Sequence, residues 1–147
     1  MKNDTLIKTM KEINPETIIL IQIGAFYHVY GKDSYILSYL CGYQIKSVEN
    51  SYNTCGFPKA GLNKNLKILE DNQINYMVVL KSQNYEVESS MKFKEKNRYL
   101  EIYEKSYKKI TLKNRINAIY NYLIENIDSP NIKNKIQNLE ESLFANV

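Results

Sequence analysis

The sequence lacks the residues and motifs on which most catalytic and metal sites depend. It has one histidine, His28, and its two cysteines, Cys41 and Cys55, have the spacing of neither a disulfide framework nor a metal site. No G-x-x-x-x-G-K-[ST] loop is present, which excludes ATP binding and hydrolysis by that route. Carboxylates such as Asp33 lie near predicted turns, where capping and solvation account for them. We therefore expect no catalytic residue, no metal ion and no cofactor, and a binding protein rather than an enzyme.

Long apolar runs are also missing. No stretch approaches the roughly 20 residues that a membrane-spanning helix needs. The N-terminal segment MKNDTLIKTMKEIN has no apolar core of signal-peptide length. We therefore expect a soluble, cytoplasmic protein that has reduced cysteines and no membrane partner.

The composition is that of an ordinary folded protein. Hydrophobic residues make up 44% and charged residues 24% of the 147 residues, which predicts one domain or one domain with a short helical appendage. The net charge of +4 is mild. It is compatible with a nucleic-acid partner but does not demand one, because charge informs about partners only where it clusters.

Helices and strands are predicted to alternate as far as residue 102. Apolar spacing predicts helices over 4–13, 34–41 and 62–72, the second of them capped by Asp33 or Ser34. Runs of β-formers predict strands over 17–23, 25–30, 43–49 and 76–80, with a short strand after residue 53 and a hairpin or edge strands within 84–102. The predicted fold class is mixed α/β (α+β), a mixed sheet flanked by helices.

The tail differs from this part. Apolar residues recur at helical spacing from Leu112 to Ile127, and Ser129-Pro130 provides a cap and a first-turn proline for a second helix. We predict a sheet domain over 1–102, followed over 103–147 by a basic linker and a helical hairpin that packs on it or on a partner.

The segment over 18–30, IILIQIGAFYHVY, is the most informative stretch of the chain. A strand, a glycine turn and the aromatic pair Phe26-Tyr27 form a compact arrangement for stacking on a base. In the alternative interpretation these two side chains point to opposite faces of a strand, and at least one of them belongs to the core.

These residues resemble domain I, the mismatch-recognition domain, of the DNA repair protein MutS. The family pattern after a hydrophobic strand is G-D-F-Y-E-x-[FY], and residues 24–30 read GAFYHVY. About 25 residues later the family has a Gly-apolar-Pro corner, a helix and an apolar strand. This chain has Gly56-Phe57-Pro58 and then the segments 62–72 and 74–79. Order, spacing and residue type agree over residues 4–102, and the resemblance implies a stand-alone domain of this fold.

The resemblance also implies roles for single residues. In the family the phenylalanine wedges into the duplex beside a mispaired base, and the glutamate accepts a hydrogen bond from that base. Phe26 holds the wedge position, but His28 stands in place of the glutamate and Ala25 in place of the aspartate. Neutral imidazole accepts one hydrogen bond and protonated imidazole only donates, so it does not follow from the wedge position alone that this chain reads mismatches.

Basic residues gather after residue 91. In a strand over 91–98 the side chains of Lys92, Lys94, Lys96 and Arg98 would leave one face and form a basic stripe about 20 Å long. Between Glu88 and Arg115 there are nine basic and four acidic residues. Such a stripe binds phosphates, or it is a solvated edge strand that lysines protect against aggregation.

Two functions follow from these patterns. The first is a non-catalytic nucleic-acid-binding module of DNA mismatch repair type, which binds DNA in preference to RNA through Phe26, Tyr27, His28 and the basic stripe. It would work beside a larger protein that docks on the C-terminal helices. The alternative is a protein–protein interaction module that kept the fold and lost its affinity for DNA.

Overall fold

The computed structural model describes residues 2–47 and 52–145. By the density of its internal packing the chain divides into two compact units, Met1–Ile110 and Thr111–Val147. The sequence-based boundary at residue 102 stays a prediction. Residues 103–110, expected as a linker, lie inside a helix.

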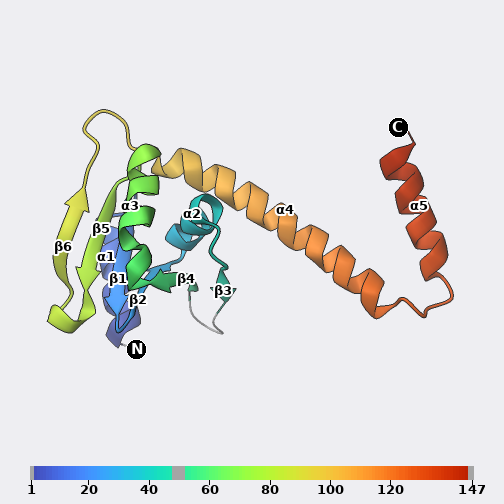
Figure 1. The fold of residues 1–147 in the computed structure, drawn as a ribbon, viewed down its shortest axis with the longest axis horizontal. Helices are drawn as coiled ribbons and strands as arrows, with labels where there is room; N and C mark the ends of the chain where they lie inside the picture. The colour runs from blue at the N-terminus through green and yellow to red at the C-terminus, as the bar shows by residue number, and fades with distance from the viewer. Residues whose placement is uncertain (1, 48–51, 146–147) are drawn as a thin grey trace. The chain divides into compact units, whose positions relative to one another are not determined.

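The first unit is built on one mixed sheet of six strands in the order β3-β4-β2-β1-β5-β6 (Figure 1). The strands are β1 Ile18–Ile23, β2 Phe26–Tyr30, β3 Lys46–Ser47, β4 Asn53–Pro58, β5 Tyr76–Leu80 and β6 Glu86–Met91. Strand β1 runs antiparallel to β2 and parallel to β5, and the other neighbouring strands pair antiparallel. This arrangement confirms the predicted fold class.

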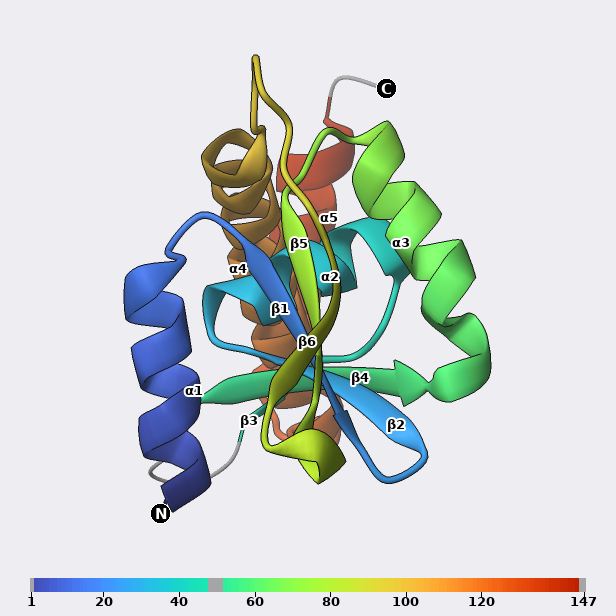
Figure 2. The same cartoon turned by 90° about the vertical axis from the view of Figure 1, so that its left-hand side faces the viewer.

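Helices cover both faces of the sheet. The helices are α1 Lys2–Ile13, α2 Lys32–Cys41, α3 Leu62–Asp71 and α4 Tyr99–Glu125, with short 3-10 turns at Lys59–Gly61 and Lys81–Gln83. Figure 2 shows α1 and α3 on opposite sides of the strands. The larger core joins the sheet to α2, α3 and the start of α4, and the smaller core lies under α1.

Strand β1 is the centre of this packing. Ile18 and Leu20 face the larger core, whereas Ile19 and Ile21 face the smaller one, and all four are buried. A run of β-branched and leucine side chains is the pattern of a strand covered on both faces, so this prediction from the sequence is confirmed.

One buried polar cluster joins α1, β1, α2 and α4. Asp33 is only 1% exposed, and its carboxylate accepts hydrogen bonds from Lys11 Nζ (2.8 Å), Tyr99 Oη (2.6 Å) and the Ile19 N–H (3.0 Å). Burial raises the pKa of Asp33, against the opposing effect of these three donors. The expectation that Asp33 caps α2 in solvent was wrong, because Gly31 occupies the N-cap and the carboxylate turns into the core.

One other expectation was also wrong, and another holds only in part. Residues 92–98 form no strand; the chain leaves β6 at Met91 and enters α4 at Tyr99. Only Lys46–Ser47 of the strand predicted over 43–49 is extended, and residues 48–49 lie outside the described part of the chain.

The second unit consists of the later turns of α4 and the whole of α5, Ile132–Phe144. Helix α5 begins after an N-cap at Asn131 rather than at the predicted Ser129-Pro130. In the parts of the chain that the structure describes, no helix combines the length and the apolar character needed to cross a membrane.

Candidate nucleic-acid interface

The turn between β1 and β2 places the predicted wedge. Ile23 pairs with Phe26 across a two-residue loop, Gly24-Ala25. Gly24 has φ +63°, the positive value that the first position of a type II′ hairpin turn requires. The Ala25 carbonyl accepts a hydrogen bond from the Lys59 N–H (3.0 Å), which ties the turn to the end of β4. The turn is therefore tight and fixed, and Phe26 is the first residue after it.

Phe26 begins a row of three rings along one face of β2. Its side chain is 48% exposed. The ring centroids of Phe26 and His28 lie 6.4 Å apart, and those of His28 and Tyr30 also lie 6.4 Å apart. Alternate residues of a strand share a face, so the strand itself sets this spacing. The row runs from solvent at Phe26 to the small core under α1, which Tyr30 contacts.

Tyr27 points to the other face and leaves the candidate interface. It is 3% exposed, its ring stacks on Phe57 with the centroids 5.7 Å apart, and its hydroxyl lies 3.4 Å from Gln22 Oε1. The prediction that Tyr27 contacts nucleic acid was wrong, because the strand alternation that exposes Phe26 buries its neighbour. The alternative interpretation, in which one of the pair belongs to the core, holds for Tyr27.

Gly56 allows His28 to lie against the backbone of β4. The two residues pair across the sheet, and a Cβ atom on Gly56 would lie 3.0 Å from His28 Nδ1 and 3.0 Å from the Tyr27 carbonyl oxygen. Burial, and secondly the charge of Lys46, lower the pKa of His28 below its usual 6.5. At neutral pH the imidazole is therefore neutral, with one nitrogen that donates and one that accepts.

A shallow hollow of about 370 Å³ opens beside this row, over the β3 side of the sheet. Its lining is Phe26, His28, Gln44, Lys46, Thr54, Cys55 and Gly56. The Cys55 thiol stays protonated, because burial raises its pKa to about 12. The hollow thus presents aromatic rings, amide and hydroxyl groups and one lysine.

The basic segment does not form the predicted stripe. Arg98 is held by Glu101 through Nε (3.0 Å), and Lys96 lies 3.9 Å from the same carboxylate. The hydrogen bond from Arg98 is the main cause that lowers the pKa of Glu101 to about 2, and Lys105 contributes to the same effect. Lys92 and Lys94 are exposed. The side chains do not leave one strand face together, because this segment is a loop.

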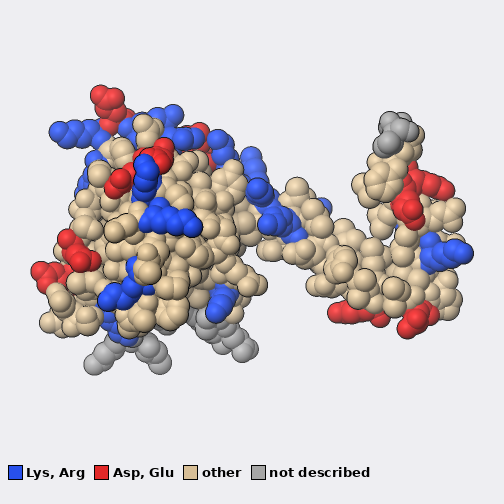
Figure 3. Space-filling model, in the orientation of Figure 1, with Lys and Arg blue, Asp and Glu red and all other residues tan. Residues whose placement is uncertain are grey.

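Asparagines hold that loop in place. Asn75 Oδ1 accepts the Phe93 N–H (2.8 Å), Asn97 Oδ1 accepts the Asn75 N–H (3.0 Å), and Asn97 Nδ2 donates to the Glu16 carbonyl (2.6 Å). These bonds replace the strand ladder that the alternating lysines suggested. Figure 3 shows basic side chains over α3 and the first turns of α4, interspersed with acidic ones.

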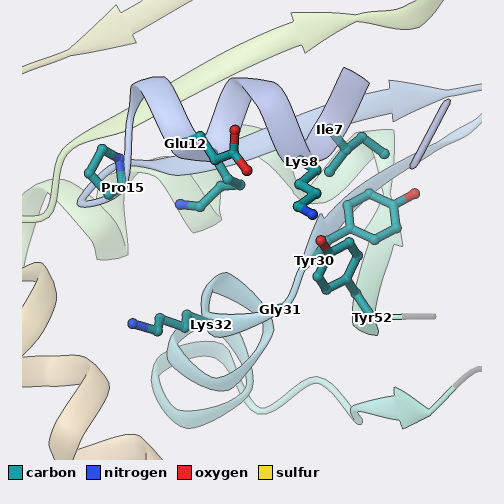
Figure 4. A pocket seen from close by; sticks show the side chains of 9 residues that line it. Ile7, Lys8, Glu12, Pro15, Tyr30, Gly31, Lys32 and Tyr52 are labelled. Atoms are coloured by element: carbon teal, nitrogen blue, oxygen red, sulfur yellow. The ribbon is translucent and has the colours of Figure 1, made fainter. Parts of the chain in front are cut away.

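A second hollow of about 370 Å³ lies between α1 and the start of α2 (Figure 4). The rings of Tyr30 and Tyr52 lie close together there, with Lys8 directed toward them. Tyr30 belongs to the aromatic row, so the row connects the exposed end of the hairpin with this second hollow.

Sequence reasoning missed Gln44, Lys46 and Gly56, which the sheet brings to Phe26 and His28. Cross-strand pairing places Lys46 and Gly56 there. The available signals were the extended pattern predicted over 43–49 and the Gly56-Phe57-Pro58 corner, and neither one connects these residues to Phe26. Among the described residues no three His, Cys, Asp or Glu side chains gather closely enough to hold a metal ion.

Comparison with known proteins completes the description of the site. A search of curated proteins finds no match. A family model, MutS domain I, matches residues 6–115 and so extends beyond residue 102, where the sequence analysis ended the resemblance. Since the match covers most of the chain and includes the hairpin with Phe26, the protein belongs to the MutS domain I family.

Proposed function

We propose that this protein is a non-catalytic nucleic-acid-binding module that binds DNA through Phe26 and the adjoining open face of the sheet. The observation that carries the proposal is the half-exposed Phe26 ring at the end of a fixed hairpin, beside a hollow lined by His28 and Lys46. Membership in the MutS domain I family supports it, because that domain is a non-catalytic recognition domain.

Phe26 acts as a wedge or stacking ring in this proposal. Insertion of an aromatic side chain between base steps costs a few kcal/mol of unstacking, and least where pairing is already weak. Stacking returns roughly 1–3 kcal/mol per base. The ring therefore favours DNA with mispaired or unpaired bases over a perfect duplex.

His28 and Lys46 have separate roles beside the wedge. The neutral His28 imidazole offers a donor and an acceptor to a base edge, whereas a carboxylate offers acceptors alone. Lys46, whose charge lowers the His28 pKa, supplies a cation for a phosphate next to the inserted ring. Lys92, Lys94 and Lys96 follow Met91, which pairs with Tyr76 at the end of the sheet away from the β1–β2 hairpin. In this proposal they contact phosphates at a distance from the inserted ring, individually rather than as a stripe.

The test is fluorescence anisotropy with labelled matched duplex, mismatched duplex, single-stranded DNA and RNA at two salt concentrations. Phe26→Ala should weaken binding by about 5- to 150-fold, the equivalent of the stacking energy of one base. The control is Val87→Ala on β6, which removes an apolar side chain of similar exposure, 45%, and should leave the affinity unchanged.

The lysines are tested through the salt dependence. A Lys92→Ala/Lys94→Ala/Lys96→Ala variant should lower the slope of log affinity against log salt by about 0.9 for each phosphate that it no longer neutralises. The charge-matched control is Lys108→Ala/Lys113→Ala/Lys133→Ala, which removes three exposed lysines of α4 and α5 and should change the slope less. Absence of binding to all four ligands at low salt would refute the proposal.

A protein-interaction module is the second candidate. The observation that favours it is the set of apolar side chains exposed along the later turns of α4 and along α5. This surface does not compete with the first proposal, because it belongs to the second unit.

A further inference from the structure

The helices of the second unit expose far more apolar surface than they bury. Within residues 111–145 one hydrophobic side chain, Ile132, is buried. Eleven large apolar side chains of the same region are 37–69% exposed. Monomeric proteins seldom expose this much apolar surface on one short segment, so it marks an interaction site.

The same spacing of apolar residues recurs in both helices. Leu112, Ile116, Ile119 and Leu123 follow one another in α4 at steps of four, three and four residues. Ile132, Ile136, Leu139 and Leu143 repeat these steps in α5. Such steps are the pattern of helices that pack in a coiled coil or a helical bundle.

The packing of α5 on α4 uses only part of this surface. Near the turn, Lys135 Nζ donates to Tyr122 Oη (2.7 Å) and lies over the Tyr122 ring, 4.9 Å from its centroid. Beyond the turn α5 leads away from α4 (Figure 1), and a hollow of about 440 Å³ lies between them. Ile116 and Leu143, far from the turn, stay more than half exposed.

We propose that the occupant of this surface is a second copy of this chain, and that two hairpins pair to form a four-helix bundle. At roughly half exposure, eleven side chains that each bury about 60–120 Å² when fully covered present on the order of 500 Å² of apolar surface. Each partner of a standard-size interface buries about 800 Å², of which somewhat more than half is apolar. The surface is thus sufficient for a stable dimer.

The charge distribution favours a second copy at this surface. Residues 111–147 contain four basic and four acidic residues, so the excess of +4 lies entirely in the first unit. Two copies of the neutral helical unit meet without net repulsion, whereas two copies of the basic first unit repel one another. A two-fold pair of this kind, in which the same patch meets itself, is the commonest arrangement of soluble oligomers.

Dimerisation has a consequence for the proposed function, although it does not depend on it. Each dimer carries two Phe26 hairpins on one particle. Where both engage the same DNA, avidity raises the overall affinity by about 10²- to 10⁴-fold without any new interaction. A module with weak affinity of its own gains most from this arrangement.

Sedimentation equilibrium of the full chain, without nucleic acid and over a wide concentration range, tests the dimer. The wild-type protein should show twice its monomer mass of 17.3 kDa. Ile116→Glu and Leu143→Glu should each raise the dissociation constant at least tenfold. The matched controls, Asn121→Glu and Asn134→Glu, add the same charge away from the apolar stripes and should keep the dimer.

Two outcomes would overturn the proposal. One is a wild-type monomer at every concentration, which would leave the surface to a different protein. The other is a dimer that the apolar variants and their controls weaken equally, which would place the interface elsewhere. If far-ultraviolet circular dichroism shows that a glutamate variant loses helix, Ile116→Ala keeps the helix propensity and should still weaken the dimer. Because nucleic acid is absent, failure here is separate from failure of DNA binding.

Discussion

The two units of this protein use a similar supply of apolar residues in opposite ways. Eighteen of the nineteen buried hydrophobic residues among those described belong to Met1–Ile110, and Ile132 is the remaining one. Eleven of the nineteen exposed large hydrophobic residues among those described belong to the much shorter Thr111–Val147. A six-stranded sheet with helices on both faces closes its own core, whereas two helices cannot. The first unit should therefore be stable by itself, and the second should depend on association.

The largest effect is expected where the first unit buries charge. Lys11→Met removes the cation beside Asp33 and leaves a buried carboxylate without its ion-pair partner, which should lower the free energy of unfolding by about 3–5 kcal/mol. Urea denaturation would measure the loss. Lys8→Met on the exposed side of the same helix is the matched control and should change stability by less than about 0.5 kcal/mol.

The double variant Lys11→Met/Asp33→Asn should recover part of that loss, because it removes both charges. If the two units unfold separately, the lower free energy of unfolding should appear in the first unit alone. An equal loss of helix and dimer in the second unit would show that the two unfold together and would end the distinction.

The second largest effect is expected at Gly56, where the backbone of β4 lies against His28. Gly56→Ala would place a Cβ atom 3.0 Å from His28 Nδ1 and from the Tyr27 carbonyl, so the imidazole must move. We expect a loss of about 1–3 kcal/mol, as for other overpacked positions, together with weaker DNA binding. Gly42→Ala, whose Cβ has no atom within 4 Å but whose φ is +82°, is the control for strain without crowding. Unchanged stability and binding in Gly56→Ala would contradict the packing of His28 on β4.

A smaller effect is expected at the turn before the wedge. Gly24 has φ +63°, and a Cβ atom at this position would have no neighbour within 4 Å, so Gly24→Ala strains the backbone without a clash. The expected cost is about 1–2 kcal/mol. If the turn positions Phe26, DNA binding should weaken while the dimer mass stays unchanged. Full binding by a destabilised Gly24→Ala variant would mean that the turn does not position the ring.

Sequence patterns predicted the elements whose causes are local. The β-branched run of β1 and the apolar run of β5 predict strands, and Asn14-Pro15 ends α1, because each signal lies within the element that it specifies. The exposed Phe26 and its glycine turn were predicted for the same reason. The lysine pattern over 91–98 predicted a strand, either a phosphate-binding stripe or a solvated edge, but this segment is a loop. Hydrogen bonds of Asn75 and Asn97, and not the lysines, determine its path.

The environments of Asp33 and His28 could not be predicted, because they depend on residues that are far away in the sequence. Asp33 meets Lys11 from 22 residues away and Tyr99 from 66 residues away, so its charge looked like that of a solvated cap. His28 meets Gly56 and Lys46 only after β3, β4 and β2 pair. Tyr27 and Phe26 are neighbours with opposite environments, and the alternation of faces along β2, rather than residue type, determines which ring is exposed.

The smallest effect concerns the protonation of His28. Its pKa is lowered in the folded state, so at a pH just below 6.5 the unfolded chain binds a proton that the folded chain excludes. The wild-type protein should therefore lose stability relative to His28→Gln as the pH falls from 6.5 through the folded pKa. Above that window the difference between the two proteins should be constant.

Because His28 is the only histidine, its proton resonance reports this pKa directly in a nuclear magnetic resonance titration. Lys46→Ala should raise the pKa toward 6.5 but leave it lower than that, since burial is the larger cause and the charge of Lys46 the smaller. The dimer mass should stay the same throughout, because the titrating group belongs to the first unit. A pKa above 7 in the wild-type protein would mean that His28 is mostly charged at neutral pH, and its role would change from reading a base edge to contacting a phosphate.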